Sequence, residues 1–423
     1  MLAARFPAAK RFFVSFILPL VIINFGNATA YLFQFLLVHA LTLDDFGRFS
    51  ALFSAMNVLW TPAVIIPLIA CQLAIELKGL GKSAEARLFF RATLVVGGVS
   101  SVIFLLVAAG SAPLAALFHV SFPAIIGAGA CVTLLFVQPI GAGLLQARGN
   151  YVSFAVAQGA VSTFRVVFGI IFVWFAGWGV SGAVWSCALP VILSLAFVVW
   201  KLRDLIGIPT VPLPSDTSAR LVRVTYPQAV TATCIALLSY ADIVIVGMQA
   251  NPSWTGLYSA AAILSRVVLL LPSALAGIIF SEAAQSRARG ELGRGNFNMT
   301  FGLTAAISVG SGLLLLFSAE FILTRFFGKD FALAVGISHL TTGAMVMLAT
   351  AQASMMFLAG RKNYHYLLPL CLFSGGFIFY ATLYATDPWG VAAALFFTNT
   401  CVAIVVFGLT FVPANGFRRR QVI

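Results

Sequence analysis

The sequence predicts an all-α, polytopic membrane protein of about twelve transmembrane helices, arranged as two parallel six-helix repeats around a central cavity. Three observations lead to this fold class. The 423 residues are 61% hydrophobic and only 9% charged, whereas a soluble domain carries about 25% charged residues. Apolar runs long enough to cross a hydrocarbon core of about 30 Å recur along the whole chain. Short motifs also repeat at a separation of about half its length.

The apolar runs are expected to be helices. In lipid only helices and closed barrels satisfy their backbone hydrogen bonds, and these runs lack the alternating pattern of a barrel strand. The first run far exceeds the 7–15-residue apolar core of a cleavable signal peptide, so we expect it to be retained. The spans lie near residues 12–40, 46–75, 92–118, 121–146, 151–176, 178–200, 224–249, 254–284, 298–319, 332–359, 364–385 and 388–413.

The basic residues indicate the orientation of the chain. Of the 25 Lys and Arg residues, 20 fall in the termini and the even-numbered loops, three in the odd-numbered loops and two within spans. This asymmetry follows the positive-inside rule, so both termini are placed in the cytoplasm. It also accounts for the net charge of +13 without a nucleic-acid partner. The predicted organisation is an N-terminal lobe at 1–205, a cytoplasmic linker at 206–222 and a C-terminal lobe at 223–423.

Three motif pairs indicate an internal duplication. They occur in the same order in both halves, at separations of 209, 213 and 211 residues. This separation corresponds to six spans, so both halves enter the membrane in the same direction. Substrates of transporters with such repeats usually bind at the interface between the repeats. The pairs are Gly47-Arg48-Phe49-Ser50-Ala51 with Gly256-Leu257-Tyr258-Ser259-Ala260, Arg148-Gly149-Asn150-Tyr151 with Arg361-Lys362-Asn363-Tyr364, and Trp178-Gly179-Val180 with Trp389-Gly390-Val391.

Polar residues at helical spacing suggest which faces line the cavity. The first span carries four of them, the second carries Asn57, and residues so spaced lie on one side of a helix. We interpret the shared pattern as a cavity lining and these residues as candidate substrate ligands. For each residue alone, hydrogen bonding to a neighbouring helix is the stronger explanation. The four on the first span are Asn24, Asn27, Tyr31 and Gln34.

Three ionisable residues lie deep in apolar spans. Arg165 is in the fifth span, Asp242 in the seventh and Arg266 in the eighth. Charged groups at such positions are costly, so each is a candidate functional residue. Asp242 and Arg266 either pair with each other or act separately. In both cases the buried charge is net positive, which favours an anionic substrate, and arginine binds phosphate in a bidentate manner.

No pattern in the sequence indicates an enzyme. There is no GxxxxGK[ST] loop for ATP and no HExxH zinc motif. The four histidines are scattered singly, and the six cysteines fall within spans without a CxxC pair, as small apolar residues often do. The sequence therefore predicts no enzyme activity, no catalytic residues, no metal site and no cofactor.

With these motifs the chain resembles the oligosaccharide flippases, the polysaccharide-transporter branch of the multidrug/oligosaccharidyl-lipid/polysaccharide (MOP) exporter superfamily. The resemblance lies in residues 43–49 and 146–151 of the first half. In the second half it lies in Tyr240-Ala241-Asp242-Ile243, in residues 256–261 and in Trp389-Gly390-Val391. It covers nearly the whole chain through loose motifs.

The resemblance implies a carrier of the bacterial inner membrane. It would flip polyprenyl-pyrophosphate-linked oligosaccharide units for O-antigen, capsule or exopolysaccharide synthesis by alternating access. Arg165 and Arg266 occupy positions that suit the anionic headgroup, and Asp242 matches an acid common in the seventh helix. A proton or sodium ion and the polysaccharide polymerase machinery are further partners that the family suggests.

Two other functions stay open. The first is a cation-coupled multidrug exporter of the same superfamily, although cationic drugs favour carboxylates or aromatic cages. The second is a membrane polysaccharide polymerase or ligase, which would need a large external loop that the spans leave no room for. Under the flippase hypothesis, Arg266→Ala should abolish transport and leave membrane insertion intact.

Overall fold

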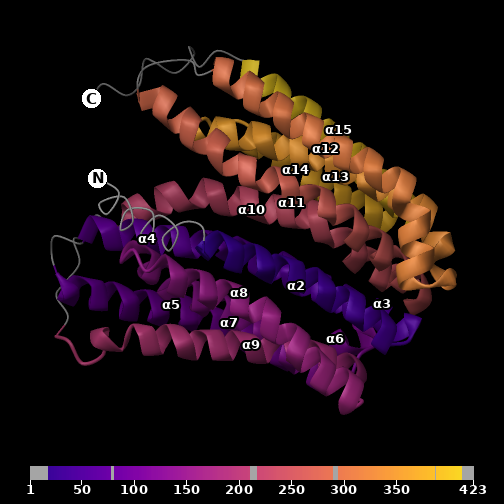
Figure 1. Cartoon of the computed structure of the whole chain (residues 1–423), viewed down its shortest axis with the longest axis horizontal. Coiled ribbons are helices and arrows are strands. Elements are labelled where there is room, and N and C mark those ends of the chain that lie inside the picture. The colour runs from indigo at the N-terminus through magenta and orange to yellow at the C-terminus, as the bar shows by residue number, and fades with distance from the viewer. Residues whose placement is uncertain (1–17, 78–80, 210–216, 289–293, 386, 412–423) are drawn as a thin grey trace, which may run out of the picture. The chain divides into compact units, whose positions relative to one another are not determined.

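The structure is a computed structural model that describes residues 18–77, 81–209, 217–288, 294–385 and 387–411. Every regular element in these ranges is a helix (Figure 1). The chain divides into two compact units, Met1–Ala229 and Val230–Ile423, each packed mainly against itself. The boundary falls inside one long helix, which therefore belongs to both units.

Unit 1 contains the first six spans. The second span is divided by a 3₁₀ segment because Pro62 and Pro67 lie at the starts of two successive helical pieces and cannot donate to the preceding turn. The fifth span ends in a π-helical segment. The helices are α2 (Leu18–Ala40), α3 (Leu43–Trp60), η2 (Thr61–Ile65), α4 (Ile66–Glu76), α5 (Lys82–Ala109), α6 (Ser111–Phe118), α7 (Phe122–Ala147), α8 (Tyr151–Gly169), η4 (Ile170–Phe175), α9 (Gly179–Lys201) and η5 (Arg203–Leu205).

Unit 2 contains the other six spans, beginning with the second part of α10. Its helices are α10 (Thr217–Gln249), α11 (Pro252–Ala288), α12 (Arg294–Ile322), η6 (Leu323–Phe327), η7 (Lys329–Leu333), α13 (Ala334–Gly360), α14 (Leu367–Leu383) and α15 (Pro388–Phe411). Among the described residues, ten helical segments are long and apolar enough to cross a membrane. The shorter apolar α14 and the long α11 occupy the two other predicted spans, so the twelve-helix fold class is confirmed.

The first duplicated motif begins with the same helix cap in both units. The side chain of Thr42 accepts a hydrogen bond from the backbone N–H of Asp45 (3.2 Å), and that of Asn251 accepts one from the N–H of Trp254 (3.0 Å). These caps satisfy a free N–H at the starts of α3 and α11. Thr42 and Asn251 are 209 residues apart, the separation of the motif itself.

The second duplicated motif forms the same helix end twice. Gly149 follows α7 with φ of 74°, and Lys362 follows α13 with φ of 54°. Asn150 N–H then donates to Leu145 O (2.9 Å), and Asn363 N–H donates to Leu358 O (2.8 Å). This is the 6→1 bond of a Schellman turn, in which a left-handed residue ends the helix. The recurring Arg-x-Asn-Tyr sequence is thus explained by a recurring turn.

A close crossing fixes α8 against α2 in unit 1. A Cβ atom built on Gly26 would lie 2.8 Å from the Cα atom of Gly159, and one built on Gly159 would lie 2.8 Å from the carbonyl oxygen of Ile22. Only glycine leaves room for this approach, as at the small-residue contacts of other membrane helices. The crossing places α2 beside Arg165 and the C-terminal part of α8.

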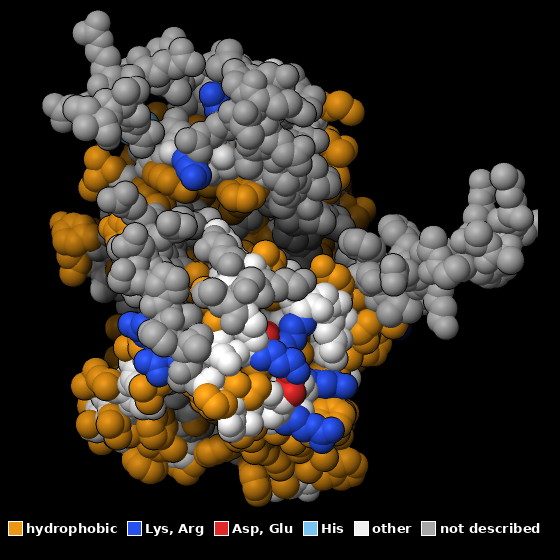
Figure 2. All heavy atoms as spheres, turned by 90° about the vertical axis from the view of Figure 1, so that its left-hand side faces the viewer, with side chains coloured by type: hydrophobic (Ala, Val, Ile, Leu, Met, Phe, Trp, Pro, Cys, Tyr) orange, Lys and Arg blue, Asp and Glu red, His pale blue; other side chains and the backbone are white. Residues whose placement is uncertain are grey.

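An ionic network joins three helix ends at one face of unit 1. Arg148 binds both carboxylate oxygens of Glu85 (2.7 and 3.1 Å) and one of Asp204 (2.8 Å), whose other oxygen lies 3.2 Å from Lys82 Nζ. Hydrogen bonds from Arg148 hold the pKa of Asp204 below its ordinary value of 3.8. Figure 2 shows Lys and Arg side chains gathered on this face with acidic side chains among them. The network ties the start of α5 to the ends of α7 and α9.

Candidate functional site

The candidate site of unit 2 is a buried ion pair between α10 and α11. The two helices are consecutive and antiparallel across a short turn, which brings Asp242 of the first opposite Arg266 of the second. Arg266 Nη2 lies 3.0 Å from Asp242 Oδ1. The side chains of Asp242 and Arg266 are 1% and 10% exposed, respectively. The sequence left open whether Asp242 pairs with Arg266 or acts separately, and in the structure the two residues are paired.

Neighbouring groups hold both members of the pair. Arg266 Nε donates to the backbone oxygen of Ser239 (2.7 Å), and its guanidinium lies 4.5 Å from the ring centroid of Tyr240. The hydroxyl of Tyr258 donates to Asp242 Oδ2 (3.2 Å). Tyr258 lies eight residues before Arg266, on the same face of α11, and is fully buried. Both oxygens of the carboxylate therefore have a donor, and the guanidinium has two partners and an aromatic face.

This arrangement is costly to disturb. A buried ion pair is at best weakly stabilising compared with apolar residues, because both charges lose their hydration. Removing one partner costs about 3–5 kcal/mol, since the other charge stays buried and unpaired. The pair therefore contributes little to stability. Protonation of the carboxylate, or binding of another cation to it, would leave Arg266 buried without a partner.

Arg165 in unit 1 has a different environment. It lies on α8, and its guanidinium carbon is 5.8 Å from the ring centroid of Phe33 and 5.4 Å from that of Phe53. Its Nε is buried and has no hydrogen-bond partner. Within the described part of the chain no carboxylate lies within 4.0 Å of it. Arg165 is therefore a cation that lies against the rings of Phe33 and Phe53, and no described residue supplies a counter-ion for it.

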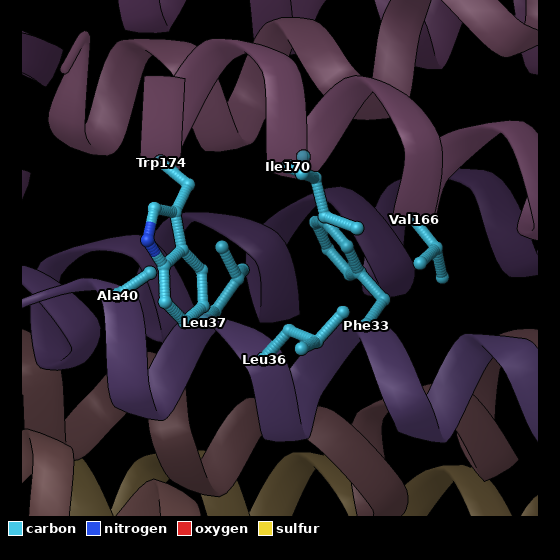
Figure 3. Close-up of a pocket in the computed structure, with 8 residues that line it drawn as sticks. Phe33, Leu36, Leu37, Ala40, Val166, Ile170 and Trp174 are labelled. Carbon is cyan, nitrogen blue, oxygen red and sulfur yellow. The ribbon is translucent and has the colours of Figure 1, made fainter. Parts of the chain in front are cut away.

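An apolar groove begins at the same aromatic ring. It is a shallow groove between α2 on one side and the C-terminal part of α8 with η4 on the other. Figure 3 shows the ring of Phe33 and the indole of Trp174 along it, with Ile170 and Leu36 between them. Its lining residues are Phe33, Leu36, Leu37, Ala40, Val166, Gly169, Ile170 and Trp174. The sequence analysis did not find this groove, because apolar residues in a membrane span carry no signal of their own.

The polar residues predicted to line the cavity on the first two spans differ in their burial. Asn24 and Asn27 are exposed on α2, and Tyr31 and Gln34 are half-buried. Asn57 is buried and bonded within its own chain segment: its Nδ2 donates to Phe53 O (2.8 Å) and its Oδ1 accepts from the indole of Trp60 (2.9 Å). Their role as substrate ligands stays a prediction.

Other polar residues of the spans bond neighbouring helices. Gln249 Nε2 donates to two backbone oxygens of α14, those of Ala381 (3.2 Å) and Thr382 (2.8 Å). The hydroxyls of Thr231 and Tyr366 lie 3.0 Å apart. These contacts join α10 to α14 and to the turn before it. Such interhelical hydrogen bonds are the role that the sequence favoured for single polar residues of the spans.

Comparisons with known proteins bear on the fold. No protein-family model matches the chain, and no curated protein matches it in sequence. Among solved structures it is similar to the inward-facing conformation of a multidrug resistance MATE family transporter of the MOP superfamily. The TM-score is 0.79 and the identity 12%, with 93% of this chain and 97% of that chain covered.

Two further structures have the same architecture. An outward-facing conformation of a multidrug resistance MATE family transporter gives a TM-score of 0.62 at 14% identity, covering 94% of this chain and 93% of that one. A MOP superfamily transporter from Pyrococcus furiosus, described as having a binding pocket of reverse polarity, gives 0.62 at 14% identity, covering 95% and 94%. The chain is a multi-pass membrane protein with the fold of the MOP transporters, and this confirms the predicted superfamily resemblance at the level of fold.

Proposed function

We propose that the protein is a secondary transporter that exports amphipathic organic molecules by alternating access, as a multidrug exporter of the MOP fold. One observation carries the proposal: nearly the whole chain superposes on a multidrug transporter of that fold, with a TM-score of 0.79. Inward-facing and outward-facing conformations both occur among the similar structures, each in a transporter described as a multidrug resistance protein. Because a fold hosts several functions, the cargo must be argued from the charged residues.

In this proposal the ion pair of unit 2 couples export to an ion. A proton on Asp242, or a sodium ion bound to it, would release Arg266 from its partner. A charge released in an apolar span is unstable, so binding of the ion favours a rearrangement of α10 against α11. An inward flow of protons or sodium would thereby drive the outward movement of cargo.

A second candidate is the lipid-linked oligosaccharide flippase suggested by the sequence. Arg165 supports it, because the Asp242–Arg266 pair is neutral, whereas the half-buried Arg165 is a cation with no carboxylate within 4.0 Å in the described part of the chain. A pyrophosphate headgroup would match such a cation. This candidate places the protein in the bacterial inner membrane with both termini in the cytoplasm, beside the polysaccharide polymerase machinery.

Two measurements on the same cells distinguish the candidates. Cells of the source strain that lack the protein are tested for accumulation of a cationic dye and, by lipid extraction and mass spectrometry, for lipid-linked oligosaccharides. Increased dye accumulation with unchanged lipids supports drug export. Accumulation of a polyprenyl-pyrophosphate oligosaccharide with unchanged dye content supports the flippase and overturns the proposal.

Ion coupling is tested with purified protein in liposomes. Dye transport should respond to an imposed proton or sodium gradient, and Asp242→Asn should remove that response. Gradient-dependent transport by the Asp242→Asn protein would contradict the assigned role of the pair.

A further inference from the structure

Unit 2 brings two cysteines together from distant parts of the sequence. Cys234 lies on α10 and Cys371 on α14, and their sulfur atoms are 3.7 Å apart. Both are free thiols in this structure. The sulfur–sulfur bond of a disulfide is about 2.05 Å long, so an approach of less than about 2 Å would join them. No spacing in the sequence indicates this pair, because 137 residues separate its members.

Contacts on both sides of the pair hold α10 and α14 together. Nearer the start of α10, the hydroxyls of Thr231 and Tyr366 lie 3.0 Å apart. At its end, Gln249 donates to the backbone oxygens of Ala381 and Thr382. Later residues of α10 thus meet later residues of α14, and the two helices run parallel. The cysteine pair lies between these contacts, which keep the two thiols close.

The two thiols differ in accessibility. Cys371 is exposed, and its neighbours Leu368 and Leu372 on α14 are 70% and 66% exposed. An exposed apolar face of a membrane span is accessible to reagents that dissolve in lipid. Cys234 is only 5% exposed. A lipid-soluble reagent therefore meets Cys371 first, and Cys234 is placed to react with whatever forms on it.

A buried hydroxyl completes the site. Ser374 lies one helical turn after Cys371 and is 1% exposed. Its Oγ lies next to the thiol of Cys234 and has no hydrogen-bond partner of its own. Buried polar groups without a partner are uncommon and call for an explanation. A hydroxyl at this place can donate to a thiolate on Cys234, and hydrogen bonds to charged groups are the stronger ones.

We propose that Cys234 and Cys371 form a modification site at which an organic hydroperoxide closes a disulfide between α10 and α14. In the first step the sulfur of Cys371 attacks the peroxide, the O–O bond breaks, and a sulfenic acid and an alcohol form. In the second step the sulfur of Cys234 attacks the sulfenic sulfur, and the hydroxyl leaves as water with the proton of Cys234. The two thiols lose two electrons, which the hydroperoxide gains.

The disulfide has a consequence for the ion pair. Cys234 precedes Asp242 by eight residues, which is about 12 Å along α10. A covalent bond to α14 at that distance opposes the rearrangement of α10 against α11 that couples the ion to export. Oxidation therefore stops export, and reduction restores it. This consequence rests on the proposed function, whereas the formation of the disulfide rests only on the geometry of unit 2.

Counting free thiols tests the modification. The purified full-length protein in a non-ionic detergent is treated with cumene hydroperoxide, denatured, and labelled with a maleimide polymer. The wild type should lose two of its six reactive thiols, and dithiothreitol should restore them. Mass spectrometry should find the peptides of Cys234 and Cys371 linked. Cys401→Ser is the matched control, because this half-buried cysteine of α15 takes no part in the pair.

Single variants test the order of the two steps. Cys234→Ser should stop at the sulfenic acid of Cys371, which dimedone traps, whereas Cys371→Ser should give neither this adduct nor the disulfide. Ser374→Ala should slow the closure at least about tenfold, the effect of one lost charge-assisted hydrogen bond. An unchanged rate would overturn the part given to Ser374. The proposal fails if the wild type keeps all its thiols, or if other cysteines are linked.

A second arm measures dye export from liposomes. Treatment with cumene hydroperoxide should stop export by the wild type, dithiothreitol should restore it, and Cys371→Ser should continue to export. Unchanged export by fully cross-linked protein would overturn the effect on transport. Cross-linking without export in either state would overturn the proposed function and support the modification site. Export without cross-linking would overturn only this inference.

Discussion

The ion pair of unit 2 allows a quantitative test of whether Asp242 and Arg266 act as one unit. The perturbation is a cycle of three variants: Asp242→Asn, Arg266→Gln and the double replacement, all in the full-length protein. The pair is 3.0 Å long and nearly inaccessible. Each single variant leaves one buried charge without its partner, whereas the double variant leaves none.

The expected magnitudes follow from the contacts that each variant loses. An asparagine in place of Asp242 would still accept from the hydroxyl of Tyr258, so Asp242→Asn should cost about 3 kcal/mol, the lower end for a broken buried pair. Arg266→Gln also removes the 2.7 Å bond to Ser239 O, which raises its cost to about 4 kcal/mol. The double variant should cost less than the sum by about 2–3 kcal/mol, the upper range of coupling between contacting residues.

Thermal unfolding and transport should respond differently to the cycle. For a unit of this size, about 1 kcal/mol corresponds to roughly 2–4 °C in Tm, so Asp242→Asn should melt about 6–12 °C below the wild type. The double variant, at about 4–5 kcal/mol, should melt about 8–20 °C below the wild type, which is less than the sum of the two single losses. It should show no transport, because the ion-binding carboxylate is gone. Additive losses, or single variants that melt like the wild type, would refute the coupling. Arg266→Ala should likewise insert in the membrane yet be less stable, since it leaves Asp242 unpaired.

Four further outcomes follow from other contacts. Tyr258→Phe removes one donor to the buried carboxylate and should lower stability by about 1 kcal/mol with the fold unchanged; an unchanged Tm would contradict the contact. Lys362→Gly relieves a left-handed residue and should raise stability by about 1 kcal/mol, as denaturant unfolding would measure. Gly159→Leu should prevent folding of unit 1, seen as aggregation in size-exclusion chromatography. Arg148→Gln should lower Tm at pH 7, but this difference should vanish as the pH falls below 3.8 through the lowered pKa of Asp204, because the protonated acid no longer pairs.

The sequence predicted the spans, the duplication and the buried charges because each depends on local composition or spacing. Apolar runs identify membrane helices whatever their partners are. An ionisable residue within such a run is conspicuous, and Arg165, Asp242 and Arg266 were found on this ground. Because consecutive helices pack antiparallel, Asp242 and Arg266 could be expected either to pair or to act separately, and the structure has them paired.

The remaining parts of the site depend on packing that spacing does not specify. The role of Tyr258 needs the rotation of α11 that directs its hydroxyl at the carboxylate. The signal was present in the eight-residue separation from Arg266, but a single tyrosine in an apolar helix is common. The groove depends on Gly169 and on the π-helical turn after it, which displaces the side chains that follow. Neither feature has a recognisable sequence pattern.

The duplication itself shows where the two halves have diverged. At the separation of 209 residues that relates the two caps, Asp242, Tyr258 and Arg266 correspond to Phe33, Phe49 and Asn57. The correspondence extends to contacts: the rings of Phe33 and Phe49 meet edge to face with centroids 6.0 Å apart, where unit 2 has the Tyr258–Asp242 hydrogen bond.

Caps and turns are therefore shared by both halves, whereas the buried polar groups differ. Unit 2 has a neutral ion pair at the positions where unit 1 has an aromatic contact. Unit 1 has the aromatic contact and carries its cation on α8 instead, where Phe33 connects Arg165 to an apolar groove. Among the described residues, the duplicated scaffold thus has a neutral charge pair in unit 2 and a cation without a carboxylate partner in unit 1.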